Sequence, residues 1–295
     1  MVRAAPHDDL PPRDQRRLRG APLDVPGAWL LPGGGVRHGE RPADALVREL
    51  AEETGYDVEI VGLRDVVSDV ALLRDPDVVM HSDRVLYDVE ITGGELRGEA
   101  GGTSDLAAWV GPADLPGLPV LPYVARLLNL PVPPEEQAPP EAELVLDRHP
   151  TRRQRFAAYG LVTDPAGRVL LTRIAPGYPG AGSWHLPGGG TDFGESSTGG
   201  LLREVVEETA QVGRVTKLLG VSDYHNPRAM GPEGHPMDWH TVRALFRVVV
   251  DDPTSPNVIE ATGGSTVEAR WLTRTGLGGL RLNEYARSVL AEHLG

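Results

Sequence analysis

The sequence predicts an α/β (α+β) fold that is built twice in tandem, and three observations lead to it. The chain has 295 residues, which suits two domains of ordinary size, each able to bury its own core. Segments at matching spacing recur in the two halves, so the chain carries an internal duplication. Within each copy, short apolar runs alternate with helical patterns, which favours an α/β/α sandwich with a mixed sheet.

The duplication extends along most of the chain. The glycine triplet at 33–35 matches a second triplet at 188–190, and "MHSDRVLYDVEI" from residue 80 matches "WHTVRALFRVVV" from residue 239. Proline and glutamate dominate the stretch between the copies, as is typical of an extended, solvated linker. We therefore expect domains at 1–130 and 151–295, joined by a linker at 131–150, and we expect that the two copies can pack as a pseudo-dimer.

The second copy gives the order of the elements. Residues 157–173 hold two apolar runs around an Asp-Pro-Ala-Gly turn, which predicts a β-hairpin. The first copy lacks most of this N-terminal hairpin, because its opening "MVR" aligns with the end of "RVLLTR". Either translation starts upstream of Met1 or this sheet is incomplete, and we favour the upstream start. The remaining elements expected in the second copy are a strand ending at the glycine triplet, a helix at 201–209, strands near 215–223, 240–250 and 268–272, and a helix at 282–294.

Composition restricts the classes of function. Apolar residues make up 40% of the chain and charged residues 24%, and no apolar run approaches the length of a membrane span. A net charge of −13 without a basic stripe argues against a nucleic-acid polymer as partner. The chain has no cysteine, which excludes disulfides and thiolate metal sites. It also shows no apolar stretch of the secretory type near its start. We expect a cytoplasmic protein that contacts no membrane.

Glutamates behind each glycine triplet form candidate metal sites. Their spacing of i, i+3 and i+4 puts three carboxylates on one helix face, where they repel one another unless a cation lies among them. Ligand sets made only of oxygen suit Mg²⁺ or Mn²⁺. Arg48 and Arg203 precede the first glutamate of each set and can orient a carboxylate through a bidentate pair. A solvated helix face is the plain alternative, but it requires the same loop, arginine and spacing to arise twice. The candidate ligands are Glu49, Glu52 and Glu53 in the first copy and Glu204, Glu207 and Glu208 in the second.

Both stretches resemble the Nudix box of the Nudix hydrolase family, G-x5-E-x7-R-E-U-x-E-E-x-G-U with U aliphatic. The first copy departs from it only at Tyr56, and the second departs at Ala210 and Gln211. The resemblance implies water attack on a nucleoside diphosphate linked to another moiety, such as ADP-ribose, or on a nucleoside triphosphate. It also implies that the glutamates after each arginine coordinate divalent metal, and that Glu40 and Glu195 support the junction of loop and helix. The matched positions with a structural role are Gly34, Glu40, Gly55, Gly189 and Glu195; those with a catalytic role are Arg48, Glu49, Glu52, Arg203, Glu204 and Glu207.

The departures in the second box weaken its helix. Gly199 and Gly200 fall near the helix start, where each costs about 1 kcal/mol relative to alanine if the position is helical. Ala210 adds roughly 1 kcal/mol if its backbone is left-handed. The first box has a favourable proline, Pro42, at its helix start and Gly55 at its end.

Residues outside the box are expected to choose the substrate. The second copy has a longer loop at 222–240, in which Tyr224, His225 and Trp239 are candidate contacts to a base or sugar. Pro227 stands where a proline resembles the pattern of ADP-ribose pyrophosphatases, although a turn residue explains it equally well. Glu268 is a candidate base or additional metal ligand, with an exposed strand residue as the alternative. Two other readings of the whole chain remain: a nucleotide-binding or sensor module in which one or both copies do not cleave, and a purely structural pseudo-dimer.

Overall fold

A computed structural model of the chain divides into two compact units, and each is described by itself. Unit 1 is Met1–Asp147 and unit 2 is Arg148–Gly295. The boundary falls inside the predicted linker, of which residues 133–150 lie outside the described residues. Among the described residues, no helix is long and apolar enough to span a membrane. The structure describes residues 1–4, 27–74, 77–99, 104–132, 151–230, 234–259 and 264–294.

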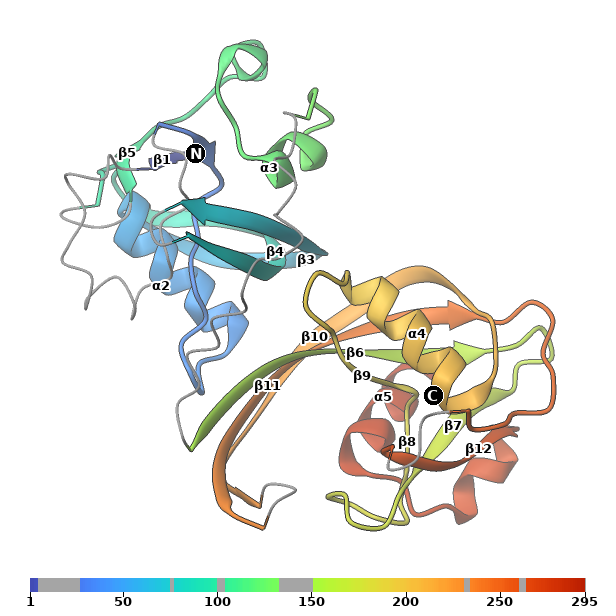
Figure 1. Cartoon of the computed structure of the whole chain (residues 1–295). Coiled ribbons are helices and arrows are strands. Elements are labelled where there is room, and N and C mark those ends of the chain that lie inside the picture. The colour runs from blue at the N-terminus through green and yellow to red at the C-terminus, as the bar shows by residue number, and fades with distance from the viewer. Residues whose placement is uncertain are drawn as a thin grey trace. The chain divides into compact units, whose positions relative to one another are not determined.

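Unit 2 is a curled mixed sheet with a helix on each face (Figure 1). The strand order is β10-β11-β6-β7-β12, with β8 beside β7 and β9 beside β6. The ladder between β11 and β6 is parallel, and the other ladders of this sheet are antiparallel. The predicted mixed sheet and opening hairpin are therefore confirmed. The elements are β6 (Arg152–Thr163), β7 (Val169–Ile174), β8 (Trp184–His185), β9 (Gly188–Gly190), α4 (Ser197–Thr209), β10 (Arg214–Met230), β11 (Pro236–Val249), β12 (Thr266–Leu272), η3 (Thr275–Gly279) and α5 (Glu284–Leu294).

Alternation along β6 sends side chains to two different helices. Leu161 belongs to a buried cluster that includes Val289 of α5. Gly160 faces the other way, where a Cβ atom would lie 3.3 Å from Leu201 of α4. Successive residues of a strand point to opposite faces, so this one strand fixes the position of both helices.

Unit 1 repeats this plan with one part absent. Its first strand pairs with β2 and β5, as β7 pairs with β8 and β12 in unit 2. Within the described residues of unit 1, no strand takes the place of β6, and β3 and β4 form a separate two-stranded sheet. The expectation that the first copy lacks most of its opening hairpin stays a prediction, because residues 5–26 lie outside the described part of the chain. The elements are β1 (Val2–Ala4), β2 (Trp29–Leu30), α2 (Pro42–Thr54), β3 (Tyr56–Arg74), β4 (Asp77–Gly94), β5 (Ser104–Ala107), η2 (Leu115–Gly117) and α3 (Pro122–Leu127).

The two helices behind the glycine triplets end alike in spite of their different sequences. Gly55 closes α2 with φ 73°, and Ala210 closes α4 with φ 55°, so the alanine does adopt the left-handed backbone. Gly199 and Gly200 are helical, so the cost in helix stability that the sequence predicts for these two glycines applies. Gly200 has a compensating role, because a Cβ atom there would lie 2.8 Å from Glu195 Oε2. The glycine therefore allows the Glu195 carboxylate to pack against the first turn of α4.

The long loop expected at 222–240 is wrong, because most of it is strand. β10 runs on to Met230, and β11 begins at Pro236 and pairs with it. The register shifts between Asn226 and Ala229, so Pro227 lies at a bulge. A bulge tolerates a residue that cannot donate a ladder hydrogen bond. The polar and proline-rich composition that indicated a loop is thus accommodated within a hairpin.

Buried His185 makes the stability of unit 2 depend on pH. Burial lowers the pKa of His185 to about 4, and its Nε2 lies 3.0 Å from Thr172 Oγ1. Below pH 6.5 the unfolded chain binds a proton that the folded chain excludes, so stability is lost as the pH falls from 6.5 toward 4. We expect this group to remove up to about 3 kcal/mol over that window. Urea unfolding of His185→Gln should show a shallower pH dependence than the parent, and equal slopes would contradict the assignment.

Candidate metal and substrate site

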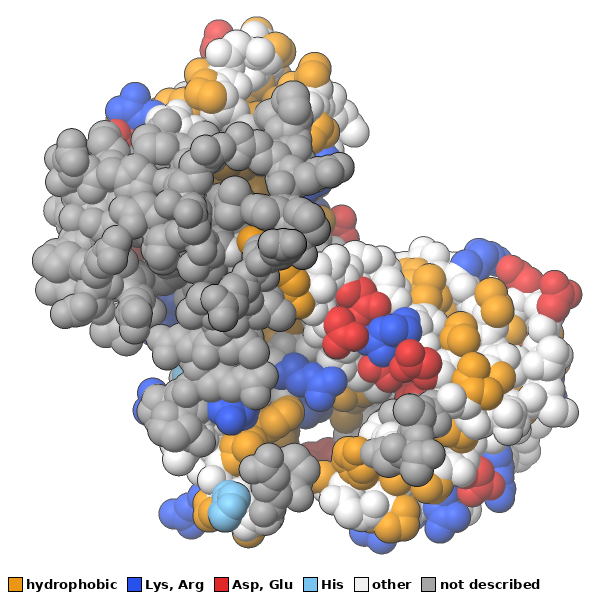
Figure 2. All heavy atoms as spheres, viewed as in Figure 1, with side chains coloured by type: hydrophobic (Ala, Val, Ile, Leu, Met, Phe, Trp, Pro, Cys, Tyr) orange, Lys and Arg blue, Asp and Glu red, His pale blue; other side chains and the backbone are white. Residues whose placement is uncertain are grey.

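One arginine organises the carboxylates of unit 2. Arg203 donates from Nε and Nη2 to the two oxygens of Glu195, both at 3.0 Å. Its Nη1 donates to Glu204 at 3.2 Å and to Glu207 at 3.1 Å, and Nη2 also reaches the carbonyl of Gly190 at 3.3 Å. This fork joins the loop to two helical glutamates one turn apart. Figure 2 shows acidic side chains gathered around basic ones on the face of unit 2 that carries α4.

Unit 1 builds the same fork. Arg48 donates from Nε and Nη2 to Glu40, both at 2.8 Å, and from Nη1 to Glu49 at 2.5 Å. Its Nη2 reaches the carbonyl of Gly35 at 3.1 Å, and Nη1 lies 3.6 Å from Glu52. The structure therefore brings together the box residues that the sequence selected, in both copies and through the same atoms.

The three helical glutamates of each unit differ in their access to solvent. The side chains of Glu52 and Glu207 are 39% and 40% exposed, whereas those of Glu49 and Glu204 are 16% and 14% exposed. Glu52 and Glu207 are therefore the more open of these glutamates to a solvated ion. The third glutamates, Glu53 and Glu208, are buried.

Each buried glutamate ties the helix to the glycine loop and to the strand after the long hairpin. Glu53 accepts hydrogen bonds from the Gly33 N–H and the Ser104 hydroxyl, both at 2.8 Å. Glu208 accepts from the Gly188 N–H at 3.0 Å and from the Thr266 hydroxyl. Both oxygens of each carboxylate are thus engaged within the fold, and their role as metal ligands stays a prediction. The sequence analysis missed the two hydroxyl partners, although Ser104 and Thr266 lie within the repeated segments.

The second glycine of each triplet is required because a carboxylate packs against it. A Cβ atom on Gly189 would lie 2.6 Å from Glu204 Oε1, and one on Gly34 would lie 2.5 Å from the carboxyl carbon of Glu49. A Cβ atom on Gly35 meets nothing within 4 Å. The middle glycine therefore sets the position of the first glutamate of the helix.

Electrostatics in unit 1 separate the box carboxyls. The hydrogen bond from Arg48 lowers the pKa of Glu40. Burial raises the pKa of Glu49 and raises that of Glu53 to about 7. Hydrogen bonding to the charged form lowers the pKa of a carboxyl, and desolvation raises it. The neighbouring carboxyls of this site therefore ionise at different pH values.

The donor set fits a hard divalent cation. In unit 2, Arg203 supplies one positive charge within hydrogen-bond distance of three carboxylates, so negative charge is in excess before the buried glutamate is counted. All the available donors are oxygens, and the most exposed one is at the surface of α4. Mg²⁺ and Mn²⁺ bind through few carboxylates and keep waters for the remaining positions.

Glu268 lies in an ion pair on the edge strand. Its Oε2 accepts from Arg173 at 3.3 Å, and its Oε1 accepts from Arg270 at 2.5 Å. Unit 1 has the same pair, in which Asp105 accepts twice from Arg3 at 2.9 Å. The recurrence favours a structural ion pair between the edge strand and its neighbour in each unit. The role of Glu268 as a base or metal ligand stays a prediction.

The three residues nominated for substrate contacts are divided between the faces of the β10–β11 hairpin. Tyr224 pairs with Thr241, and Trp239 donates its ring N–H to Thr241, so these two share a face. His225 pairs with His240 on the opposite face and binds Asp238 at 2.7 Å. Of the three nominated residues, Tyr224 and Trp239 share one face of the hairpin and His225 lies on the other. Their contact with a substrate stays a prediction.

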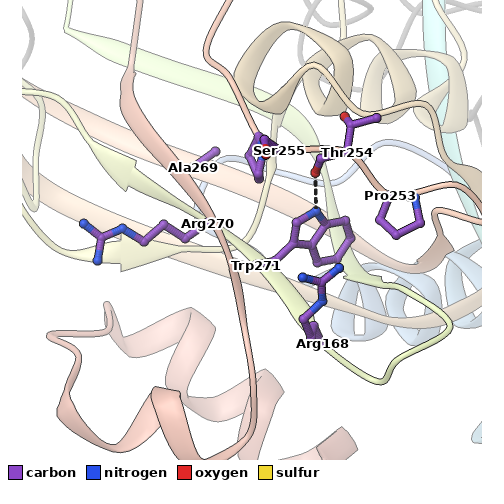
Figure 3. A pocket seen from close by; sticks show the side chains of 8 residues that line it. Arg168, Pro253, Thr254, Ser255, Ala269, Arg270 and Trp271 are labelled. Atoms are coloured by element: carbon purple, nitrogen blue, oxygen red, sulfur yellow. Dashed lines mark hydrogen bonds between the residues drawn. The ribbon is translucent and has the colours of Figure 1, made fainter.

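A hollow of about 370 Å³ in unit 2 is lined by residues that include Arg168, Thr254 and Trp271 (Figure 3). Trp271 donates from Nε1 to the carbonyl of Thr254 at 3.1 Å, and the Arg168 guanidinium lies 5.5 Å from the Trp271 ring. Gln211, which departs from the aliphatic place of the box, bonds both to the Thr254 hydroxyl and to its N–H. The departure is therefore satisfied by the loop that follows β11.

Comparisons with known proteins follow the duplication. The family model for the NUDIX domain matches residues 15–128 and again residues 153–292. The chain is 40% identical over 78 residues to the putative 8-oxo-dGTP diphosphatase 2 of Mycobacterium tuberculosis, which is 26% of this chain and 50% of that protein. It is 35% identical over 106 residues to the putative 8-oxo-dGTP diphosphatase of Bacillus subtilis, which is 36% of this chain and 64% of that protein. The chain thus spans about half the length of the first relative and under two thirds of the second.

A solved structure is also similar to one half of the chain. The MutT NUDIX hydrolase of Burkholderia pseudomallei is 26% identical, with a TM-score of 0.38. The match covers 48% of this chain and 98% of that one.

The packing of Glu49 on Gly34 can be tested through metal binding. We expect Gly34→Ala to push the Glu49 carboxylate away and to weaken Mn²⁺ binding at one of two sites by about tenfold or more. Gly35→Ala is the matched control, because its added methyl meets open space and neither glycine has a positive φ. Calorimetric titration of the full chain measures both variants. Two sites of parental affinity in Gly34→Ala would contradict the proposed ligand role of Glu49.

Proposed function

Because the chain belongs to the NUDIX domain family, we propose that it is a divalent-metal-dependent hydrolase that cleaves the phosphate chain of a nucleotide derivative. The observation that carries this proposal is the arginine fork, built twice, with a partly exposed glutamate at the surface of each helix. Such a cluster has excess negative charge and only oxygen donors, which suits Mg²⁺ or Mn²⁺ between protein and phosphate.

The proposed reaction is hydrolysis of a phosphoanhydride. The oxygen of water bonds to one phosphorus, the bridging P–O bond breaks, and the released proton passes to solvent. Bound metal supplies charge neutralisation and a more acidic water. Glu207, the most exposed glutamate of α4, would hold the ion, and Arg203 holds Glu204 toward the same place. The loop carbonyl of Gly190 is fixed by that arginine, so the loop and ligands keep one geometry.

The proposed substrate class is a small nucleotide derivative. The two sequence relatives are named for 8-oxo-dGTP, a nucleoside triphosphate, which supports a triphosphate as one candidate. A nucleoside diphosphate linked to a sugar, such as ADP-ribose, is the other. Both place a negative phosphate chain beside a planar base, and with a net charge of −13 on the chain, bound metal would help such anions to approach.

Unit 2 is proposed to carry most of the turnover. Its sheet has the β6 strand that the described part of unit 1 lacks, and β6 lies directly beside the glycine strand β9. The triplet of unit 2 is therefore held in a ladder. Nucleotide binding without cleavage is the second candidate function, and it applies best to unit 1, where β3 and β4 stand as a two-stranded sheet within the described residues.

Metal dependence is the first test. We expect EDTA to abolish hydrolysis of a panel of nucleoside triphosphates and nucleotide sugars, and Mg²⁺ or Mn²⁺ to restore it, because the carboxylates need a counter-charge near phosphate. Release of phosphate-containing products is measured by chromatography. Full turnover in EDTA would remove the metal from the mechanism.

The division of labour between the units has a matched test. Glu207→Gln and Glu52→Gln remove the same charge from the same helix position, and only the unit differs. We expect Glu207→Gln to lower kcat by about a hundredfold or more, because it removes a proposed ligand from the unit that carries the turnover. Glu52→Gln should change kcat little, because it removes the matching ligand from the other unit. If Glu52→Gln alone abolishes turnover, unit 1 is the enzyme.

A further inference from the structure

An arginine in the middle of β11 lies between two tyrosine rings. The Arg243 guanidinium is 4.8 Å from the centroid of Tyr224 and 4.9 Å from that of Tyr285. Tyr285 in turn packs edge-on against Tyr159 at 5.4 Å and belongs to the core beneath the sheet. A cation over the face of an aromatic ring is attracted by that ring without using its N–H donors in conventional hydrogen bonds. Arg243 is thus a cation held in place by rings.

Arg243 lies on a direct line across the sheet to the glycine loop. Ala157 of β6 pairs with Arg243 on one side and with Gly190 on the other, so two strand spacings, about 10 Å, separate them. Arg155 is on the same face, because it pairs with Thr241, two residues before Arg243. Its guanidinium lies against Gly190, where a Cβ atom would be 1.9 Å from Arg155 Nε. Two cations therefore lie on one side of the loop, and Glu204 contacts the loop from the other side.

The two cations have no carboxylate partner within the described residues of unit 2. Arg203 on the box side is saturated by Glu195, Glu204 and Glu207. Two arginines without counter-charge, beside a site rich in carboxylates, call for an anion from solution.

Unit 1 supplies a natural comparison. Arg84 has the position of Arg243, and its guanidinium lies 4.4 Å from the ring centroid of Tyr123. Two positions before the arginine stands Ser82 in unit 1 and Thr241 in unit 2. The residue across the hairpin is Asp69 opposite Ser82, and Tyr224 opposite Thr241. Asp69 accepts from Arg84 at 2.7 and 3.2 Å. One substitution on β3 thus neutralises the cation that unit 2 leaves available.

We propose that Arg243, clamped between Tyr224 and Tyr285 and assisted by Arg155, binds a phosphate group of the substrate on the sheet side of the Gly190 loop, and that Asp69 cancels this subsite in unit 1. The inference rests on the proposed function for its ligand class, a nucleoside diphosphate or a longer phosphate chain. A guanidinium edge matches two phosphate oxygens. One part of the phosphate chain is gripped by Arg243 while another reaches the carboxylates of α4.

Binding in the absence of metal separates this subsite from catalysis. The affinity of the full chain for ADP, inorganic pyrophosphate and adenosine is measured by calorimetry in EDTA, where hydrolysis does not contribute. We expect Arg243→Gln to weaken ADP by about ten- to a hundredfold, the cost of losing hydrogen bonds to a charged group, and to leave adenosine unchanged. Arg243→Lys, which keeps the charge without the fork, should fall between the parent and Arg243→Gln.

The second variant transplants the residue of unit 1. Tyr224→Asp should pair with Arg243 and weaken ADP as much as Arg243→Gln does, whereas Tyr224→Phe keeps the ring and should retain ADP affinity. Tyr224 is 43% exposed, so neither change disturbs the core, and thermal melting confirms that each variant is folded.

Three outcomes would overturn the proposal: parental ADP affinity in Arg243→Gln, equal loss of ADP and adenosine, or no binding of ADP and pyrophosphate by the parent at millimolar concentration. Loss of ADP binding in Arg243→Gln, together with no turnover of any substrate by the parent, would support the subsite and reject the hydrolase.

Discussion

The bidentate pair between the box arginine and the loop glutamate is the interaction on which the site depends. Arg203 with Glu195, and Arg48 with Glu40, fix the guanidinium plane by two parallel hydrogen bonds. Only then can the remaining N–H groups reach the helical carboxylates and the loop carbonyl together. Without the fork, carboxylates one turn apart would repel each other and the loop would lose its link to the helix. The arginine therefore acts as the internal counter-ion, and it leaves enough negative charge for a metal.

A second constraint works from below the helix. Glu53 and Glu208 each accept a hydrogen bond from a glycine N–H and another from a strand hydroxyl. These bonds link the helix, the loop and the edge strand. Burial of a carboxylate carries a desolvation penalty, which hydrogen bonds must offset. That penalty is visible in the raised pKa of Glu53. The box thus combines an outer carboxylate that meets solvent with an inner one that anchors the scaffold.

Local features were predictable from the sequence, whereas features set by strand pairing were not. The helix ends followed from Pro42 and Gly55, and the shared face of the glutamates followed from their spacing. A loop at 222–240 gave no reason to expect Tyr224 and His225 on opposite faces. They are separated because side chains alternate along a β-hairpin, which continues past a bulge at Pro227. The partners of Glu268 lie elsewhere on the edge of the sheet, and Arg155 meets Gly190 only because β6 pairs with β9.

The two units show how a duplicated scaffold can diverge while keeping its box carboxylates. Each keeps the arginine fork, the buried glutamate and the arginine over a tyrosine from the closing helix. What differs is the surrounding of that last arginine and the strand that supports the glycine loop. Asp69 forms an ion pair with Arg84 in unit 1. In unit 2 a tyrosine ring stands in place of that carboxylate, and Arg243 has no carboxylate partner among the described residues. A carboxylate in place of a ring changes what the surface can attract while costing the fold little, because Tyr224 lies on the outer strand β10 and is 43% exposed. Divergence of substrate binding can therefore proceed on the sheet while the helix and loop, constrained by packing around Gly34 and Gly189, stay fixed.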